Sequence, residues 1–119
     1  MKLRLATEHI RFRISQSEFV ALTESQEITA TLNLPFATRL QYTIRPDAQT
    51  ASPEGNPLGF EASRDTGGMI WSLTVYRSAI NMLIKPEHAK NGVKEIFTFD
   101  QGDMLSVTLE IDIDRRTSI

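Results

Sequence analysis

The chain has 119 residues and a formal net charge of −2, and 40% of its residues are hydrophobic. We expect residues 1–119 to form a single domain, because this length is typical of one. A charge so close to zero argues against general binding to nucleic acid or to a membrane surface. The absence of cysteine excludes disulfides, thiolate catalysis and thiolate metal sites, and it fits a reducing cytoplasm. No apolar stretch is long enough to span a membrane.

Two alternating segments open the chain. Residues 2–6 alternate basic and apolar side chains, which predicts a strand. In residues 10–14, three apolar residues alternate with Arg11 and Arg13, so this strand has one apolar and one cationic face. Residues 7–9 then form a turn. One long bent strand is the alternative, because the turn lacks Gly, Asn and Pro.

A short helix is expected directly after the second strand. Ser15 and Glu18 have the spacing of a capping box, in which each side chain bonds the backbone amide of the other residue. Phe19 and Leu22 lie one helical turn apart and form the apolar face. A helix that ends near Ser25 is too short to be stable alone, so this face must pack on a sheet.

The middle of the chain contains four expected strands and one long loop. Residues 28–34 and 40–44 alternate apolar and polar side chains, and we expect them to form an antiparallel hairpin. Residues 46–58 contain three prolines and read as a loop joining two halves of the chain. Residues 60–64 and 69–76 are the next strands, separated by a glycine-containing hairpin turn.

The last third of the chain is expected to be a helix followed by two strands. The pattern turns helical at Ser78, and residues 93–99 and 105–113 then alternate as strands. We assign Met69, Trp71 and Met82 to the core. Residues 115–119 read as a loose tail.

The two halves of the chain share one pattern. Residues 14–22 align with residues 75–83 at a constant offset of 61, and each half reads strand, strand, helix, strand, strand. The expected fold is α+β, with two pseudo-symmetric ββαββ repeats over about residues 1–45 and 59–114. The sheet is expected to be mainly antiparallel, with two short helices packed on it.

The opening of the chain resembles a family of small uncharacterised bacterial proteins. Residues 2–5 read K-L-R-L and residues 10–18 read I-R-F-R-I-S-Q-S-E. Members of the family open with K-[IL]-R-[IL], then a short turn, then I-R-[FL]-R-[IL]-[ST]-[QR]-S-E. Residues 109–113 fall where members carry V-E-K-D-F, so Ile111 stands in place of a family lysine. The resemblance implies the fold and a bacterial, cytoplasmic setting, and it implies no activity.

A stripe of acidic residues is the feature of the sequence that most resembles a catalytic or metal-binding site. Glu110, Asp112 and Asp114 share one face of the last strand. Their oxygens could hold a hard cation in a metal-dependent hydrolase, but carboxylates at alternate strand positions lie about 7 Å apart, which is wide for one ion. The favoured interpretation is a solvated face, or pairing with the basic residues of the two opening strands.

The cationic face of Arg11 and Arg13, with Arg4 as a candidate third member, is the second candidate. Arginines in this arrangement could grip a phosphate or a carboxylate. Nucleic-acid binding by a sheet usually requires aromatic side chains on the same face, and Phe12 points the other way. The candidate ligand-binding residues are therefore Arg11, Arg13, Glu110 and Asp112.

No catalytic arrangement was found around the two histidines, His9 and His88, which we interpret as surface residues. The leading hypothesis is a non-enzymatic interaction domain or small-ligand-binding domain without a cofactor. A hydrolase using the acidic stripe and a weak nucleic-acid-associated protein using Arg11 and Arg13 are the alternatives. A homodimer through an edge strand is also expected, with residues 106–114 as the suggested edge because that strand is long.

Overall fold

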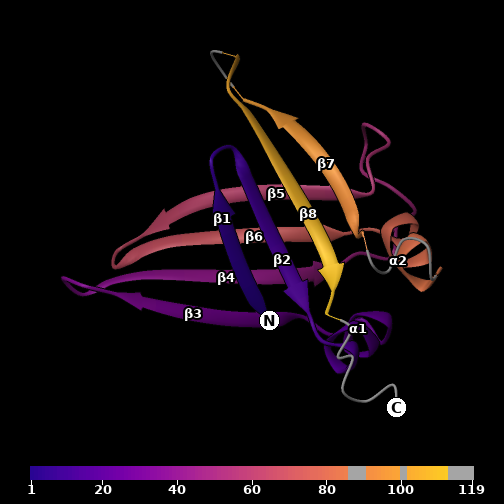
Figure 1. The fold of residues 1–119 in the computed structure, drawn as a ribbon, viewed down its shortest axis with the longest axis horizontal. Helices are drawn as coiled ribbons and strands as arrows, with labels where there is room; N and C mark the ends of the chain where they lie inside the picture. Colours follow the sequence, from indigo (N-terminus) through magenta and orange to yellow (C-terminus); the bar gives the residue numbers. More distant parts are fainter. Residues whose placement is uncertain (86–90, 100–101, 113–119) are drawn as a thin grey trace.

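The computed structural model describes residues 1–85, 91–99 and 102–112 (Figure 1). Within these ranges the chain forms eight strands and two helices. In chain order they are β1 (Lys2–Ala6), β2 (His9–Ile14), α1 (Gln16–Thr23), β3 (Ile28–Leu34), β4 (Thr38–Pro46), β5 (Leu58–Asp65), β6 (Gly68–Val75), α2 (Arg77–Ile84), β7 (Val93–Thr98) and β8 (Met104–Ile111).

The strands form two four-stranded mixed sheets. Sheet A has the order β1-β2-β8-β7, and sheet B has the order β3-β4-β6-β5. In each sheet the outer pairs are antiparallel hairpins, whereas the central pair, β2 with β8 or β4 with β6, is parallel. The α+β fold class is confirmed. The opening segments form a hairpin and not one bent strand, since β1 pairs with β2.

The suggestion that residues 106–114 form a sheet edge is wrong. The strand in this region, β8, lies in the middle of sheet A because it pairs with β2 on one side and with β7 on the other. Its high content of apolar residues reflects that central position. The edges of the two sheets are β1 and β7 in sheet A and β3 and β5 in sheet B.

The first helix is held at both ends by local hydrogen bonds. The Glu18 amide donates to Ser15 Oγ at 3.1 Å, and the Ser15 amide donates to the Glu18 carboxylate at 2.8 Å, so the predicted capping box is present. At the other end, the amides of Ser25 and Gln26 donate back to Leu22 and Ala21. That pattern, with Ser25 at a φ of 63°, is a Schellman ending.

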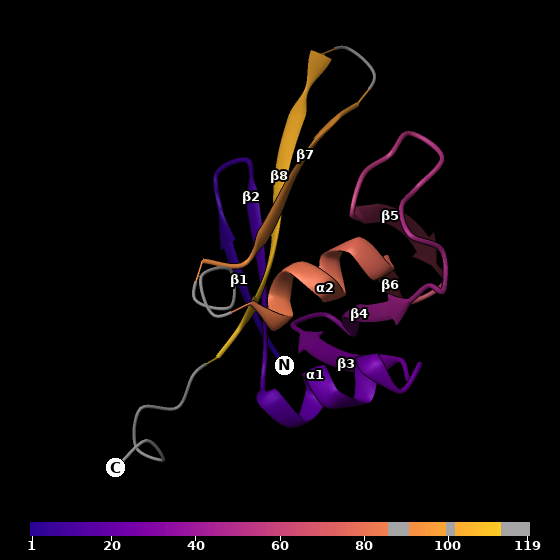
Figure 2. The ribbon, with the colours of Figure 1, turned by 90° about the vertical axis from the view of Figure 1, so that its right-hand side faces the viewer.

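One apolar cluster joins the two sheets and both helices. Phe12, Ile44, Leu73 and Leu109 are fully buried in it, one from each central strand. Figure 2 shows that α1 and α2 lie on the side of sheet A that faces sheet B. The opposite face of sheet A is covered by neither helix. Met69 was expected in the core but is 40% exposed, because it lies near the outer end of β6.

The two halves of the chain are built alike. The bounds of α2 equal those of α1 shifted by 61 residues, which matches the offset in the sequence. The half before the loop contributes the β1–β2 hairpin to sheet A and the β3–β4 hairpin to sheet B. The second half contributes β7–β8 to sheet A and β5–β6 to sheet B. Each sheet therefore contains one hairpin from each half, joined along a parallel pair.

Candidate functional site

Basic side chains line up across the face of sheet A that points away from the core. Arg4 on β1 is paired in register with Arg11 on β2, Arg11 with Thr108 on β8, and Thr108 with Lys94 on β7. The three cations, which we call the cationic row, are exposed, whereas Thr108 between them is buried. The row arises because alternate residues of each strand face outward, and because β2 and β8 are parallel neighbours.

The neighbouring positions on the same face form a network of ion pairs. Arg13 Nε lies 3.1 Å from Glu110 Oε1, and Arg13 Nη1 lies 4.0 Å from Asp112 Oδ1. Lys2 Nζ lies 3.6 Å from Asp112 Oδ2. The Glu110 side chain is only 7% exposed, so its carboxylate depends on Arg13 for compensation of its charge. Here, basic and acidic groups balance one another.

The cationic row lacks such balance within the described ranges. No carboxylate there lies within 4.0 Å of Arg4, Arg11 or Lys94. Arg4 and Arg11 are direct cross-strand partners, an arrangement of like charges that destabilises a sheet. This part of the face is therefore a local concentration of positive charge in a chain whose formal net charge is −2.

His9 lies beside the cationic row. Its Nε2 atom is 2.9 Å from Thr108 Oγ1, the hydroxyl that lies between Arg11 and Lys94 in the register. Burial lowers the pKa of His9 below its ordinary value of 6.5, and the charges of Arg11 and Lys94 lower this pKa further, against an opposing effect of Glu110. The cations of the row thus act on the imidazole in the same direction as burial, which has the larger effect.

A shallow hollow of about 400 Å³ opens at the β1–β2 side of this face. Arg4, Arg11 and His9 line it together with Leu5 and Ala6. Two guanidinium groups and an imidazole around one hollow can form charge-assisted hydrogen bonds to an anion. This combination of shape and charge makes the hollow the candidate functional site.

The candidate residues identified from the sequence fall into two groups in the structure, those in the ion-pair network and those outside it. The structure brings Arg13, Glu110 and Asp112 together in the ion-pair network, as the favoured interpretation of the acidic stripe predicted. It leaves Arg11 outside that network, next to Arg4. Asp114, the third residue of the stripe, and His88 lie outside the described residues.

Sequence reasoning missed Lys94 and assigned no role to His9. The alternation of residues 93–99 indicated that Lys94 faces away from the core. What the sequence could not indicate is that β8 lies between β2 and β7, which places Lys94 and His9 around Thr108. The missing information was the pairing of strands that are far apart in the chain.

No group of three His, Asp or Glu side chains in the described ranges could hold a metal ion. Glu110 and Asp112 do share one face, but both are engaged by Arg13. A cation at this position would have to displace a guanidinium group from a buried carboxylate. The arrangement therefore favours structural pairing over metal binding.

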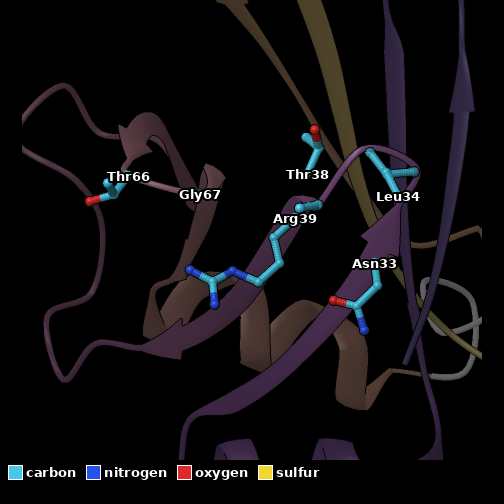
Figure 3. A pocket seen from close by; sticks show the side chains of 7 residues that line it. Asn33, Leu34, Thr38, Arg39, Thr66 and Gly67 are labelled. Carbon is cyan, nitrogen blue, oxygen red and sulfur yellow. The ribbon is translucent and has the colours of Figure 1, made fainter.

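A second hollow, of about 590 Å³, lies at the turn end of sheet B (Figure 3). It is lined by residues of the β3–β4 and β5–β6 turns, among them Leu34, Thr38 and Gly67. The Arg39 side chain extends between the two turns, and its Nη2 atom lies 3.4 Å from Asp65 Oδ2. Because Asp65 balances the charge of Arg39, this hollow is a weaker candidate for binding a charged ligand.

The chain belongs to a family of unknown function (DUF7009), whose model matches residues 1–115. Comparison with curated proteins and comparison with solved structures each found no match. In the described part of the chain, neither helix is long and apolar enough to cross a membrane. The family carries no assigned activity, so a functional assignment has to come from the geometry of the site.

Proposed function

We propose that this member of the family of unknown function is a non-enzymatic domain that binds a small anion on the outer face of sheet A. The ligand is a compact polyanion that carries phosphate or carboxylate groups. Arg4, Arg11 and Lys94 supply the positive charge, and His9, whose imidazole is held by Thr108, supplies a polar contact. The observation that carries this proposal is the cross-strand pairing of Arg4 with Arg11, without a carboxylate within 4.0 Å among the described residues.

The physical argument concerns the cost of that arrangement. Like charges directly opposite one another in a sheet are unfavourable by roughly 0.2–1 kcal/mol. At the neighbouring positions of the same strands, the positive charge of Arg13 is balanced by Glu110, its partner on β8. A bound anion would neutralise the cationic row in the same way. Of the residues pointed to by the sequence, Arg11 contacts the ligand in this proposal, whereas Arg13, Glu110 and Asp112 support the face.

A small anion fits the face better than nucleic acid does. Among its described residues, the outer face of sheet A carries no Phe, Tyr or Trp on which a base could stack. The hollow of about 400 Å³ suits a small molecule. The metal-dependent hydrolase is less well supported, since Arg13 already compensates the carboxylates of Glu110 and Asp112.

The test is isothermal titration calorimetry with pyrophosphate and with citrate at low ionic strength. We expect one saturable site for at least one of the two anions, and the pair of probes distinguishes a phosphate ligand from a carboxylate ligand. Arg11→Gln should weaken binding by about tenfold or more, because a charge-assisted hydrogen bond contributes about 1.5–3 kcal/mol. Arg64→Gln, on sheet B, is the matched control and should bind like the wild type. Equal affinities of the two variants would contradict the proposal.

The pH dependence gives the site a second signature. Burial disfavours the charged imidazole of His9 in the free protein, and the charges of Arg11 and Lys94 disfavour it further, so the pKa of His9 is low. A bound anion would oppose the charges of the two cations and raise this pKa, so binding would take up a proton at His9, and His9 would strengthen binding as the pH falls. His9→Gln should remove this dependence. A pH dependence that is the same in the wild type and in His9→Gln would contradict the assignment of His9, because protonation of the anion itself affects both proteins equally.

The wider setting is part of the same proposal. The absence of cysteine and the opening motif support a bacterial, cytoplasmic protein. The shared 61-residue offset of the helices supports the view that residues 1–45 and 59–114 are repeats of one ββαββ unit. The apolar cluster shared by both sheets supports a single domain over residues 1–119.

A further inference from the structure

We propose that the β3 edge of sheet B pairs antiparallel with the β3 edge of a second copy of this chain. A sheet edge presents unpaired backbone groups, and proteins usually protect such an edge with charged residues, proline or a bulge. Three of the four edge strands carry charges: β1 has Lys2 and Arg4, β5 has Glu61, Arg64 and Asp65, and β7 has Lys94 and Glu95. The fourth edge, β3, reads I-T-A-T-L-N-L and contains neither charge nor proline.

The side chains near this edge are unusually apolar for a surface. Leu32 and Leu34 are 46% and 42% exposed on β3, and Phe36 in the following turn is 99% exposed. Figure 1 shows β3 along the lower edge of sheet B, with α1 beyond its first residues. Most of the edge is therefore accessible to a partner.

The turn holds Phe36 in a conformation that an L-amino acid rarely adopts. Phe36 and Ala37 have φ values of 64° and 57°, in the left-handed region where glycine or asparagine is usual. Two successive positive φ values are a feature of tight hairpin turns. This turn presents the aromatic ring of Phe36 to solvent at the tip of the β3–β4 hairpin, and docking on a partner would bury that ring.

Thr31 is the middle residue of β3. If the two copies pair about a twofold axis through Thr31, apolar side chains meet on the core side of the sheet and polar side chains meet on the other side. On the core side, Leu32 would lie opposite Ala30 of the second copy, and Leu34 opposite Ile28. On the other side, Thr31 would meet its own counterpart. In the same register, Phe36 would lie level with Gln26 of the second copy, in the segment between α1 and β3.

The charges at the two ends of β3 are balanced within each copy. Glu27, which precedes the strand, lies 2.9 Å from Arg45, and Arg39, next to the far end of the strand, lies 3.4 Å from Asp65. Antiparallel pairing of two copies therefore brings no unpaired like charges together at either end of the strand.

Sedimentation equilibrium of the full chain, from micromolar to millimolar concentration, tests the proposal. We expect the wild type to show a reversible dimer. Thr31→Lys places two like charges at the twofold axis and should leave a folded monomer whose Tm does not depend on protein concentration. Ser63→Lys makes the same change on the outer face of edge β5 and should leave the dimer intact. Phe36→Ser should weaken dimerisation about tenfold, as truncation of a buried aromatic anchor does.

Three results would overturn the proposal: a wild type that stays monomeric at millimolar concentration, a Thr31→Lys variant that still dimerises, or a Ser63→Lys variant that dissociates equally. The Phe36→Ser variant keeps the test decisive if Thr31→Lys does not fold, because Phe36 makes no contribution to the core. If the wild type is monomeric but the anion still binds, the dimer fails and the proposed function stands.

Discussion

Removing Arg13 should destabilise the fold much more than removing the acid that Arg13 pairs with. Arg13 Nε lies 3.1 Å from Glu110 Oε1, and their side chains are 31% and 7% exposed. In the Arg13→Gln variant, the Glu110 carboxylate would remain buried without its cation. In the Glu110→Gln variant, Arg13 would keep its access to solvent and its contact with Asp112.

The expected losses in the free energy of unfolding follow from the exposure of the two side chains. Removing one partner of a fully buried ion pair typically costs about 3–5 kcal/mol. Because Arg13 is partly exposed, water can reach the vacated position, and we expect about 2–3 kcal/mol for Arg13→Gln. Glu110→Gln leaves no buried charge and should cost about 1 kcal/mol, near the net value of one hydrogen bond.

Urea unfolding at neutral pH, followed by circular dichroism, measures both costs. Arg45→Gln is the matched control, because its partner Glu27 lies 2.9 Å away with both side chains more than half exposed. That exposed pair should be worth only about 0.5 kcal/mol.

The reasoning would be refuted if Arg13→Gln and Glu110→Gln lowered the free energy of unfolding by the same amount. Equal costs would mean that the Glu110 carboxylate is solvated in the folded chain. In that case Glu110 and Asp112 would be available for ligands, and the division of the face into a structural network and a binding row would be wrong.

Three further changes test the packing on which the account depends. Ser15→Ala should lower the free energy of unfolding by about 1 kcal/mol in a denaturant titration. Burial opposes ionisation of Glu18, but the hydrogen bond from the Ser15 amide and the amino group of Met1 keep the pKa of Glu18 below the ordinary 4.5. The Glu18 carboxylate therefore stabilises the fold above pH 4.5, and this contribution is lost on acidification. Gly68→Ala should cost about 3 kcal/mol, because the added Cβ would lie 1.8 Å from the Arg39 carbonyl oxygen; an unchanged Tm would exclude that contact. Ser78→Ala should raise Tm slightly, since the Ser78 hydroxyl is buried with no hydrogen-bond partner in the described structure, and a fall in Tm would reveal a partner.

Local features of the fold could be predicted from the sequence because they depend on neighbouring residues. The capping box of Ser15 and Glu18 is an example, since the spacing of the two side chains determines the bond. The alternation around Phe12 correctly placed its ring in the core and its arginine neighbours outside. The 61-residue offset likewise followed from matching short patterns.

The arrangement of the sheets could not be predicted in the same way. Alternation shows that β8 has an apolar face, but it does not show which strands flank it. Placing β8 between β2 and β7 pairs Glu110 with Arg13 and puts Lys94 and Arg11 on either side of Thr108, although these residues lie about 100 and 80 positions apart in the chain. The candidate site consists of such long-range neighbours, so Lys94 was not identified from the sequence.

The most direct test of the central claim is a nuclear magnetic resonance titration of the isotopically labelled chain with pyrophosphate and with citrate. The account predicts saturable shifts for at least one of the two anions, largest at the amides of Thr108 and Lys94 and at the side-chain Nε groups of Arg4 and Arg11. The resonances of Arg64 on sheet B should not move. Shifts spread over all arginines, or confined to sheet B, would contradict an anion site on the outer face of sheet A.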